Sequence, residues 1–198
     1  LGAIVITGGM VATKTIEAAS LTVSTTSTIT KDITTTGIQT YSGATLIAGN
    51  TVLDTTTANA ITFGGTLNSS GGARSLGLDA TTAAVQFGGI VGGTTAFGAI
   101  AITGAMDLNS DIGDSSVGAA SLTVSTTSDF ANAVTNIALV RTTGLQTYSG
   151  AANLTSNTSL INTDSPITFG AALTSAAAAN RTLTINAGTG ITTFTGTV

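Results

Sequence analysis

The sequence predicts an all-β protein, a stacked β-solenoid of about eight or nine coils. Three observations lead to this fold: a long internal repeat, a shorter rhythm of strand-like segments, and a composition of small residues. Of the 198 residues, 43 are Thr and 25 are Gly, and only 7% of the chain is charged. The mean hydropathy of +0.47 is typical of a folded chain and not of a disordered one.

The internal repeat divides the chain into copy 1 (1–96) and copy 2 (97–198), which we expect to form one continuous solenoid. The second copy carries additional residues between 106 and 119 and between 128 and 143. Insertions at these places are expected if both lie in turns. The matching blocks, in chain order, are 1–10 with 97–106, 18–27 with 119–128, 36–44 with 143–151, 61–64 with 167–170, and 74–91 with 181–198.

The shorter rhythm comes from segments that alternate apolar and polar residues, the signature of a half-buried strand. Their apolar centres recur roughly every 18 to 25 residues, as from Val23 to Tyr41, Phe63 and Phe87. A β-sandwich is the alternative, but it would show turn signals every 8 to 12 residues or so. In order along the chain, the clearest segments are 21–23, 61–63, 76–78, 85–87, 100–102 and 183–185.

Helix is poorly supported, because Thr and Gly dominate and no long helical stripe occurs. Residues 176–179 are the one helix-tolerant run, and we interpret them as a loop or corner insertion. Inside the solenoid we expect ladders of Val, Ile, Leu and Phe, with Thr and Ser facing outward. Neither Leu1 nor Val198 is flanked by charge or Pro that would blunt an open edge. We therefore expect the ends to be covered by more of the same, in a longer array or by head-to-tail stacking.

Three repeated phrases resemble the β-strand repeats of giant bacterial surface proteins, the filamentous-haemagglutinin-like and autotransporter-like adhesins. These phrases are Thr-Gly-Leu-Gln-Thr-Tyr-Ser-Gly at 143–150, Ile-Thr-Phe-Gly-Gly-Thr-Leu at 61–67, and Val-Gln-Phe-Gly-Gly-Ile-Val-Gly-Gly-Thr-Thr at 85–95. The resemblance covers essentially the whole chain. It implies a secreted, right-handed parallel β-helix that forms a fibre or stalk at the surface of a Gram-negative-type cell. It carries over no catalytic residues.

The composition argues against several functions. The chain has no His, Cys or Trp, which removes the commonest general base, thiol nucleophiles and the usual zinc ligands. The acids are scattered, so we expect no enzyme activity and no cofactor. No basic cluster that could hold a phosphate backbone is present, and no apolar run approaches the ~18 residues of a membrane span. We expect neither a nucleic-acid partner nor a membrane span.

One weak metal candidate remains in the segment 107–114. Asp107, Asn109 and Asp111 occupy the first, third and fifth positions of a calcium-type loop, with Asp114 close behind. The Gly falls one place late, position 12 is Gly118 and not an acid, and the first copy has no acids at the counterpart. Because Asp, Asn and Gly are also good turn formers, a plain turn is the favoured interpretation.

Two functional hypotheses follow. The first is a structural segment of an extracellular or cell-surface filament, whose partner is another copy of itself stacked head to tail, with bundling of rods as an option. The second is an adhesin module whose lateral surface binds glycans or proteins of a host or a neighbouring cell. Aromatic residues make up only 4% of the chain, which leaves few of the residues that dominate binding surfaces. The structural hypothesis is therefore favoured.

Overall fold

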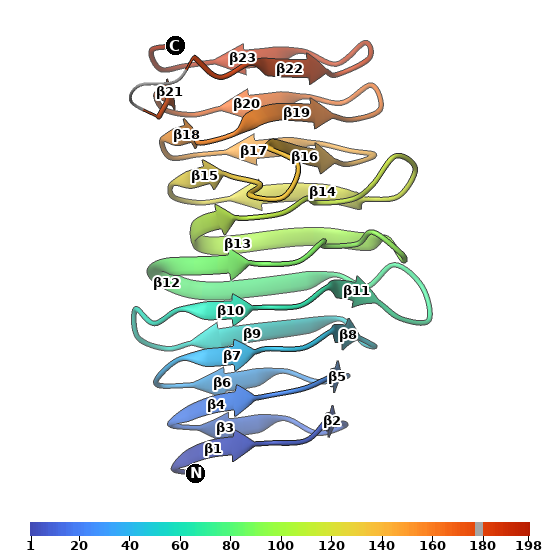
Figure 1. The fold of residues 1–198 in the computed structure, drawn as a ribbon, viewed down its shortest axis with the longest axis vertical. Coiled ribbons are helices and arrows are strands. Elements are labelled where there is room, and N and C mark those ends of the chain that lie inside the picture. Colours follow the sequence, from blue (N-terminus) through green and yellow to red (C-terminus); the bar gives the residue numbers. More distant parts are fainter. Residues whose placement is uncertain (177–179) are drawn as a thin grey trace.

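The computed structural model describes residues 1–176 and 180–198, which form a right-handed parallel β-helix of about eight turns (Figure 1). Strands are the only regular elements in these residues, and every strand pair is parallel. The predicted solenoid is therefore confirmed. Of the predicted insertion at 176–179, residues 177–179 lie outside the described part of the chain.

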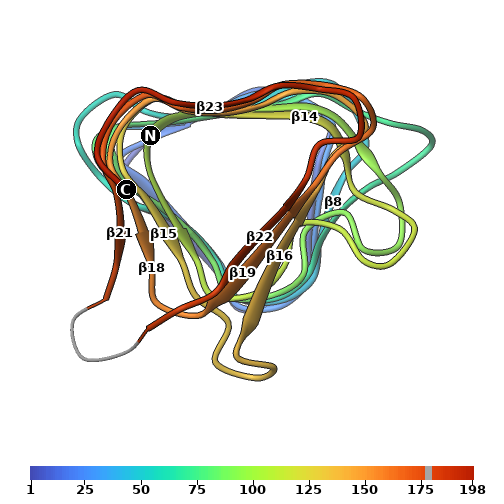
Figure 2. The same cartoon turned by 90° about the horizontal axis from the view of Figure 1, so that it is seen from above.

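Each turn contributes one segment to each of three faces, so the rod has a triangular cross-section (Figure 2). Face 1 stacks β1 (Ala3–Ile6), β4 (Ser20–Val23), β7 (Gln39–Tyr41), β10 (Ile61–Phe63), the second half of β12 (Leu76–Phe87), the second half of β13 (Phe97–Leu108), β15 (Ser128–Phe130), β18 (Ala152–Leu154) and β21 (Leu173–Ser175).

Face 2 follows face 1 along the chain. It stacks β2 (Met10–Ala12), β5 (Ser27–Ile29), β8 (Thr45–Ile47), β11 (Leu67–Ser69), single bridging residues Val91 and Ile112, β16 (Ile137–Arg141), β19 (Asn157–Ile161) and β22 (Leu183–Asn186).

Face 3 closes each turn. It stacks β3 (Ile16–Ala18), β6 (Ile33–Thr35), β9 (Thr51–Thr55), the first halves of β12 and β13, β14 (Ala119–Val124), β17 (Gln146–Tyr148), β20 (Ile167–Phe169) and β23 (Thr192–Phe194).

The register of the strands matches the rhythm of the sequence. On face 1, Val23 pairs with Tyr41, Tyr41 with Phe63, and Phe63 with Phe87. The same apolar position therefore lies directly above itself in successive turns, as the sequence predicts. Between the two end rungs, each strand shares its backbone hydrogen bonds with the strands above and below, so the stack needs few charges for cohesion.

Inward side chains form continuous ladders that make up a single core. The longest one follows face 3 and changes from aliphatic to aromatic residues along the rod. Burying such side chains contributes roughly 1.5 to 3 kcal/mol each. Its members are Ile16, Ile33, Leu53, Leu78, Ile102, Val124, Tyr148, Phe169 and Phe194.

The corners differ from the prediction that Thr and Ser face outward. Several Thr side chains are buried at corners, where the hydroxyl donates to a nearby main-chain carbonyl, as Thr35 does to Gly37 and Thr142 to Gly144. A short side chain with its own donor can satisfy a carbonyl that the turn removes from the strand ladder. Thr side chains therefore occur both on the outer surface of the faces and in buried positions at the corners.

The two copies are rotated relative to each other by one face. Copy 1 supplies fourteen strand segments, counting Val91 and the two halves of β12, and each turn uses three. Fourteen segments are one short of five full turns. Each segment of copy 2 therefore lies one face earlier than its counterpart in copy 1. The Gln-Thr-Tyr segment, for instance, is β7 on face 1 in copy 1 and β17 on face 3 in copy 2.

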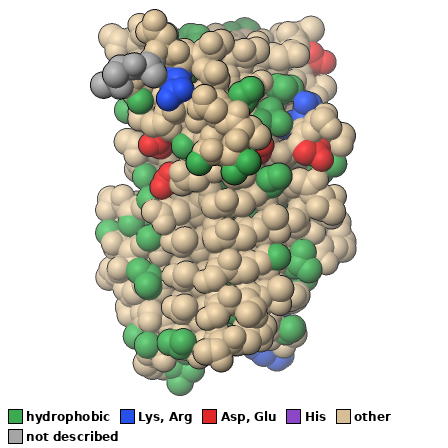
Figure 3. Space-filling view, viewed as in Figure 1, with side chains coloured by type: hydrophobic (Ala, Val, Ile, Leu, Met, Phe, Trp, Pro, Cys, Tyr) green, Lys and Arg blue, Asp and Glu red, His purple; other side chains and the backbone are tan. Residues whose placement is uncertain are grey.

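The outer surface is mostly neutral. Figure 3 shows one side of the rod, on which acidic side chains gather in the upper half and most of the remaining surface is uncharged. Outward Thr residues stack in register at the centres of faces, for example Thr22, Thr40 and Thr62. Within the described residues no helix of the length and apolarity required for a membrane span occurs.

Candidate functional site

The predicted calcium residues do not converge on one point. Asp107 is on the outward side of β13, where its carboxylate accepts a hydrogen bond from the Asn109 side chain at 2.8 Å. Burial raises the pKa of Asp107, and Asp129 in the next turn raises it further. Asp111 accepts hydrogen bonds from Leu139 N at 2.8 Å and from Asn132 Nδ2 at 3.0 Å. Asp111 therefore links its own turn to the next one, whereas the Asp107 carboxylate accepts its hydrogen bond from Asn109 in the same turn.

Asp114 organises a loop of its own. Its Oδ1 accepts hydrogen bonds from the backbone N–H groups of Ser116 and Val117, both at 2.7 Å, and these bonds lower the pKa of Asp114. In the described part of the chain, no three acidic, His or Cys side chains lie close enough together to bind a metal ion. Asp107 lies in β13, and the residues after Leu108 form bends around the bridging residue Ile112.

A buried polar network recurs in both copies. In copy 1, the side chain of Gln39 is fully buried and its Nε2 donates to the carbonyls of Ile33 and Asp54 and to Thr35 Oγ1, while Tyr41 Oη donates to Gln39 Oε1 at 2.8 Å. This network, which we call the Gln–Tyr staple, ties β6, β7 and β9 together at the corner between faces 3 and 1.

Copy 2 repeats the staple at the corner between faces 2 and 3. Gln146 Nε2 donates to the carbonyls of Val140 and Ile161 and to Thr142 Oγ1, and Tyr148 Oη donates to Gln146 Oε1 at 3.0 Å. Burial raises the pKa of Tyr41 and of Tyr148 far above the usual range, so both hydroxyls remain donors. Both tyrosines are therefore core residues whose hydroxyls are hydrogen-bonded.

Each staple stands at the start of an aromatic ladder. Tyr41 stacks on Phe63 with ring centroids 5.2 Å apart, and Phe63 stacks on Phe87 at 5.7 Å. In copy 2, Tyr148 stacks on Phe169 and Phe169 on Phe194, at 5.2 and 5.1 Å. Stacked rings at such distances stabilise the pair by roughly 0.5 to 1.5 kcal/mol beyond area burial.

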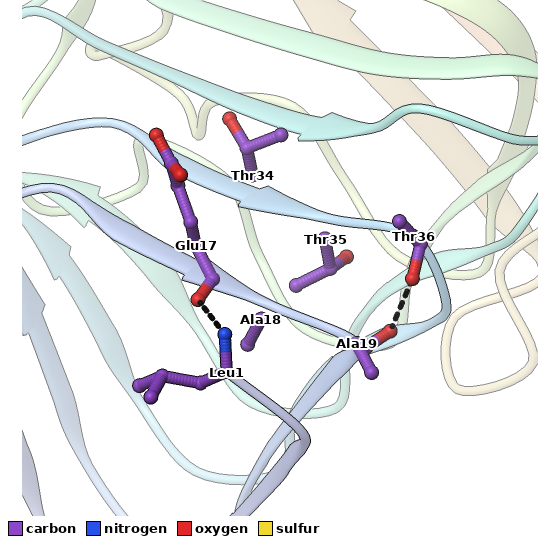
Figure 4. A pocket seen from close by; sticks show the side chains of 7 residues that line it. All are labelled: Leu1, Glu17, Ala18, Ala19, Thr34, Thr35 and Thr36. Atoms are coloured by element: carbon purple, nitrogen blue, oxygen red, sulfur yellow. Dashed lines mark hydrogen bonds between the residues drawn. The ribbon is translucent and has the colours of Figure 1, made fainter.

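A shallow pocket of about 300 Å³ lies over the copy 1 staple, at the corner between faces 3 and 1 (Figure 4). Figure 4 shows Leu1 N donating to the carbonyl of Glu17, and Thr36 Oγ1 donating to that of Ala19. We call this concavity corner pocket 1. It is lined by Leu1, Glu17, Ala18, Ala19, Thr34, Thr35 and Thr36.

A second pocket of about 390 Å³, corner pocket 2, lies at the corner between faces 2 and 3. It is flanked by loops that project beyond the triangular outline beside face 2 in Figure 2. Its lining includes Ala119, Ala120, Arg141, Thr142 and Thr143. In the repeat these residues are the counterparts of Ala18, Ala19, Thr34, Thr35 and Thr36 of corner pocket 1.

The end rungs are open. The first rung (β1, β2 and β3) and the last rung (β21, β22 and β23) each have strand neighbours on one side only. Phe194 in the last rung is 41% exposed, whereas Phe169 directly below it is 1% exposed. At the other end Ile4, Ile6 and Ile16 are only partly buried. Within residues 1–176 and 180–198, no strand lies over the apolar side chains that face the core at either end.

No protein-family model matches the chain, and neither a curated protein nor a solved structure is significantly similar to it. Function therefore has to be inferred from the geometry. The structural features that could have a functional role are the staples, the corner pockets and the open rungs. Of these, sequence reasoning anticipated only the ends, and it missed both pockets.

Proposed function

We propose that this chain is a structural repeat segment of an extracellular or cell-surface bacterial β-solenoid, a filament or stalk that grows by end-to-end strand stacking. The observation that carries the proposal is the pair of open rungs. Each presents unpaired strand edges and uncovered apolar side chains that face the core. Such an edge is a template for another strand.

The geometry favours continuation in the same direction. β23 is on face 3, and the next segment of a right-handed climb belongs to face 1, the face of β1. If a second copy follows, its β1 lies on β21, so that its Ile4 covers Leu173 and its Ile16 covers Phe194. In a longer chain, flanking coils of the same kind would cover these edges in the same way.

The resemblance to repeats of bacterial surface adhesins supports an exported location. The composition is compatible with this, because a continuous core of stacked ladders stabilises a rod without disulfides, and the chain has no Cys. The mostly neutral lateral surface suits a spacer that presents other parts of a surface protein.

The experiment compares Phe194→Asp with Thr193→Asp. Stacking would bury the side chain at position 194 between two rungs, whereas position 193 faces outward and stays in water. We expect the unaltered chain and Thr193→Asp to form elongated species whose mass grows with concentration in sedimentation velocity. Phe194→Asp should remain a monomer, because a buried unpaired charge is strongly unfavourable.

Circular dichroism of each variant checks that the monomer is folded. A folded, strictly monomeric unaltered chain at high concentration would contradict the proposal, and so would equal elongation of both variants.

A second candidate function, recognition of glycans or proteins by the lateral surface, has one structural feature in its favour. That feature is corner pocket 2, the larger of the two pockets described above.

A further inference from the structure

We propose that corner pocket 2 is a binding site for a neutral, linear oligosaccharide, with Arg141 as its main hydrogen-bond donor. The site is independent of end-to-end stacking, because it lies on the side of the rod between faces 2 and 3.

The pocket runs along the rod. Its lining extends from Ala73 through Phe97, Ala119 and Thr142 to Thr163, which belong to successive turns. At a strand spacing of about 4.8 Å, four steps between turns give a length of about 19 Å. The volume of about 390 Å³ falls within the range of small-ligand sites, roughly 300 to 1,000 Å³. An elongated ligand parallel to the rod axis fits this shape.

Two features of copy 2 convert the shallow pocket of copy 1 into this groove. The first is an insertion: Ile112 and the start of β14 are joined by residues 113–118, whereas β3 and β4 of copy 1 are joined by Ala19 alone. The second is Arg141, which takes the place of Thr34. Insertions into a repeat commonly build a binding face, because the repeat itself supplies a rigid support.

The inserted loop is held in a defined shape. Gly113 has a φ of 85°, a conformation that favours glycine. Asp114 bonds the backbone of Ser116 and Val117, as described above, and its backbone N donates to the carbonyl of Val117 at 2.7 Å. Arg141 Nε donates to the Asp114 carbonyl at 2.7 Å, which couples the arginine to the loop. The loop and Arg141 are thus positioned before a ligand arrives.

Donors and acceptors remain available in the groove. Within residues 1–176 and 180–198, the two Nη atoms of Arg141 have no hydrogen-bond partner, nor do the hydroxyls of Thr143 and Thr163. Small side chains at Ala73 and Ala96 line the rest of the groove, and Gly118 lets the inserted loop pack closely against the backbone of Arg141. Sugar rings present hydroxyls at the edge and C–H groups on the face, and this lining complements both.

The charges favour a neutral ligand over an anionic one. The guanidinium of Arg141 lies near the carboxylate of Asp114, and the attraction contributes to the lowered pKa of Asp114. Asp164, next to Thr163 in the lining, also has a lowered pKa, mainly because Thr189 N donates to its carboxylate. Both acids therefore remain ionised, so the one positive charge in the lining has two negative charges on residues beside the lining, an arrangement that disfavours a polyanion.

Peptide and nucleic-acid ligands fit less well. An extended peptide binds by adding a strand to a free edge, but the strands that border the groove are already paired above and below. A nucleic acid requires several cations along its backbone, and Arg141 is the only basic residue in the described lining.

The test uses the full 198-residue chain with cellotetraose, maltotetraose and chitotetraose as neutral probes and tetragalacturonate as the acidic probe. We expect at least one neutral probe to perturb the amide NMR signals of residues 116–118 and 141–143. Arg141→Thr, which restores the residue of copy 1, should weaken that binding roughly tenfold, because hydrogen bonds from a charged donor are lost. Arg181→Gln, on a different side of the rod, is the control and should bind unchanged.

The outcomes separate the ligand classes. No perturbation by any neutral probe overturns the inference, and so does binding that Arg141→Thr leaves unchanged. Binding of tetragalacturonate alone would contradict the assignment of a neutral ligand. Because Arg141→Thr leaves the end rungs intact, its sedimentation behaviour should match that of the unaltered chain, whatever the result for stacking.

Discussion

The two copies of the repeat make the same contacts on different faces of the rod. The staple of Gln39 and Tyr41 lies between faces 3 and 1, and that of Gln146 and Tyr148 lies between faces 2 and 3, yet each uses the same atoms on equivalent partners. The repeat therefore encodes a corner followed by a strand, and not a particular face of the triangle. A solenoid built from such units can rotate its copies without changing the local structure.

The difference between the copies lies at the corner pockets. In copy 1 the pocket is lined by Thr34 and bounded by a one-residue connection, whereas copy 2 has Arg141 and the inserted loop 113–118. Both copies keep the contacts that build the rod, and they differ at a position beside the staple, which is Thr34 in copy 1 and Arg141 in copy 2. We infer that the staple maintains the fold, while the surface residues at the corner beside it can change without loss of the fold.

The largest expected effect tests the equivalence of the staples. Replacing Gln39 or Gln146 by Leu leaves two main-chain carbonyls and a tyrosine hydroxyl without their partner in the core. We expect each variant to lose about 3 kcal/mol of unfolding free energy, measured by chemical denaturation. Thr147→Val, one residue along on the outward side, is the control and should change little. Losses that differ strongly between the two staples would break the comparison.

The next effect concerns a glycine that only copy 1 has. A Cβ at Gly65 would lie 2.5 Å from the carbonyl carbon of Gly43 in the turn below, so we expect Gly65→Ala to cost about 2 kcal/mol. The counterpart in copy 2 is Ala171, where a Cβ is already present. Gly8→Ala, which has open space around the added carbon, is the control in the same thermal denaturation series. An unchanged melting temperature for Gly65→Ala would show that the corner relaxes.

Alkaline pH tests the two buried tyrosines together. Their pKa values are raised in the folded state, so the unfolded chain loses protons first as the pH rises above about 10. Stability is therefore constant below that pH and falls above it, by about 1.4 kcal/mol per tyrosine at pH 11. Denaturation between pH 8 and 11 measures this slope. In Tyr41→Phe and in Tyr148→Phe the slope should halve, and a slope that persists in the double variant would point to other groups.

The smallest effect also involves one residue in each copy. Ser27 and Ser128 are buried counterparts whose hydroxyls have no hydrogen-bond partner in the described structure. Replacing either by Ala removes an unsatisfied polar group, so we expect a gain of up to about 1 kcal/mol in each case. Matching gains would confirm that the two sites are equivalent although they lie on faces 2 and 1. A loss of stability in either variant would show that its hydroxyl has a partner, such as water.

The sequence predicted the fold well because the solenoid depends on local patterns. Alternation identified strands such as 61–63 and 85–87, and the spacing between them gave the pairing of Phe63 with Phe87 directly. Parallel stacking in register needs no information beyond that spacing. The repeat also matched the tyrosines correctly, because both staples use the same phrase.

The three faces and the corner pockets could not be predicted in this way. The number of segments per turn depends on bends that can be as short as one residue, such as Ala19 between β3 and β4. Without the number of segments per turn, the rotation of copy 2 relative to copy 1 cannot be derived from the sequence. The pocket around Arg141 also combines residues from several turns, among them Ala73 and Thr163. The insertion between 106 and 119 was the one signal that pointed to it.

The most direct test of the central claim, that coils continue from one copy into the next, is electron cryo-microscopy of assembled material. The account predicts unbranched filaments with a repeat of about 4.8 Å along the axis and a triangular section, in which β1 of one copy lies on β21 of the copy before it. Filaments in which no rod continues end to end into the next, or in which two identical ends meet, would contradict it.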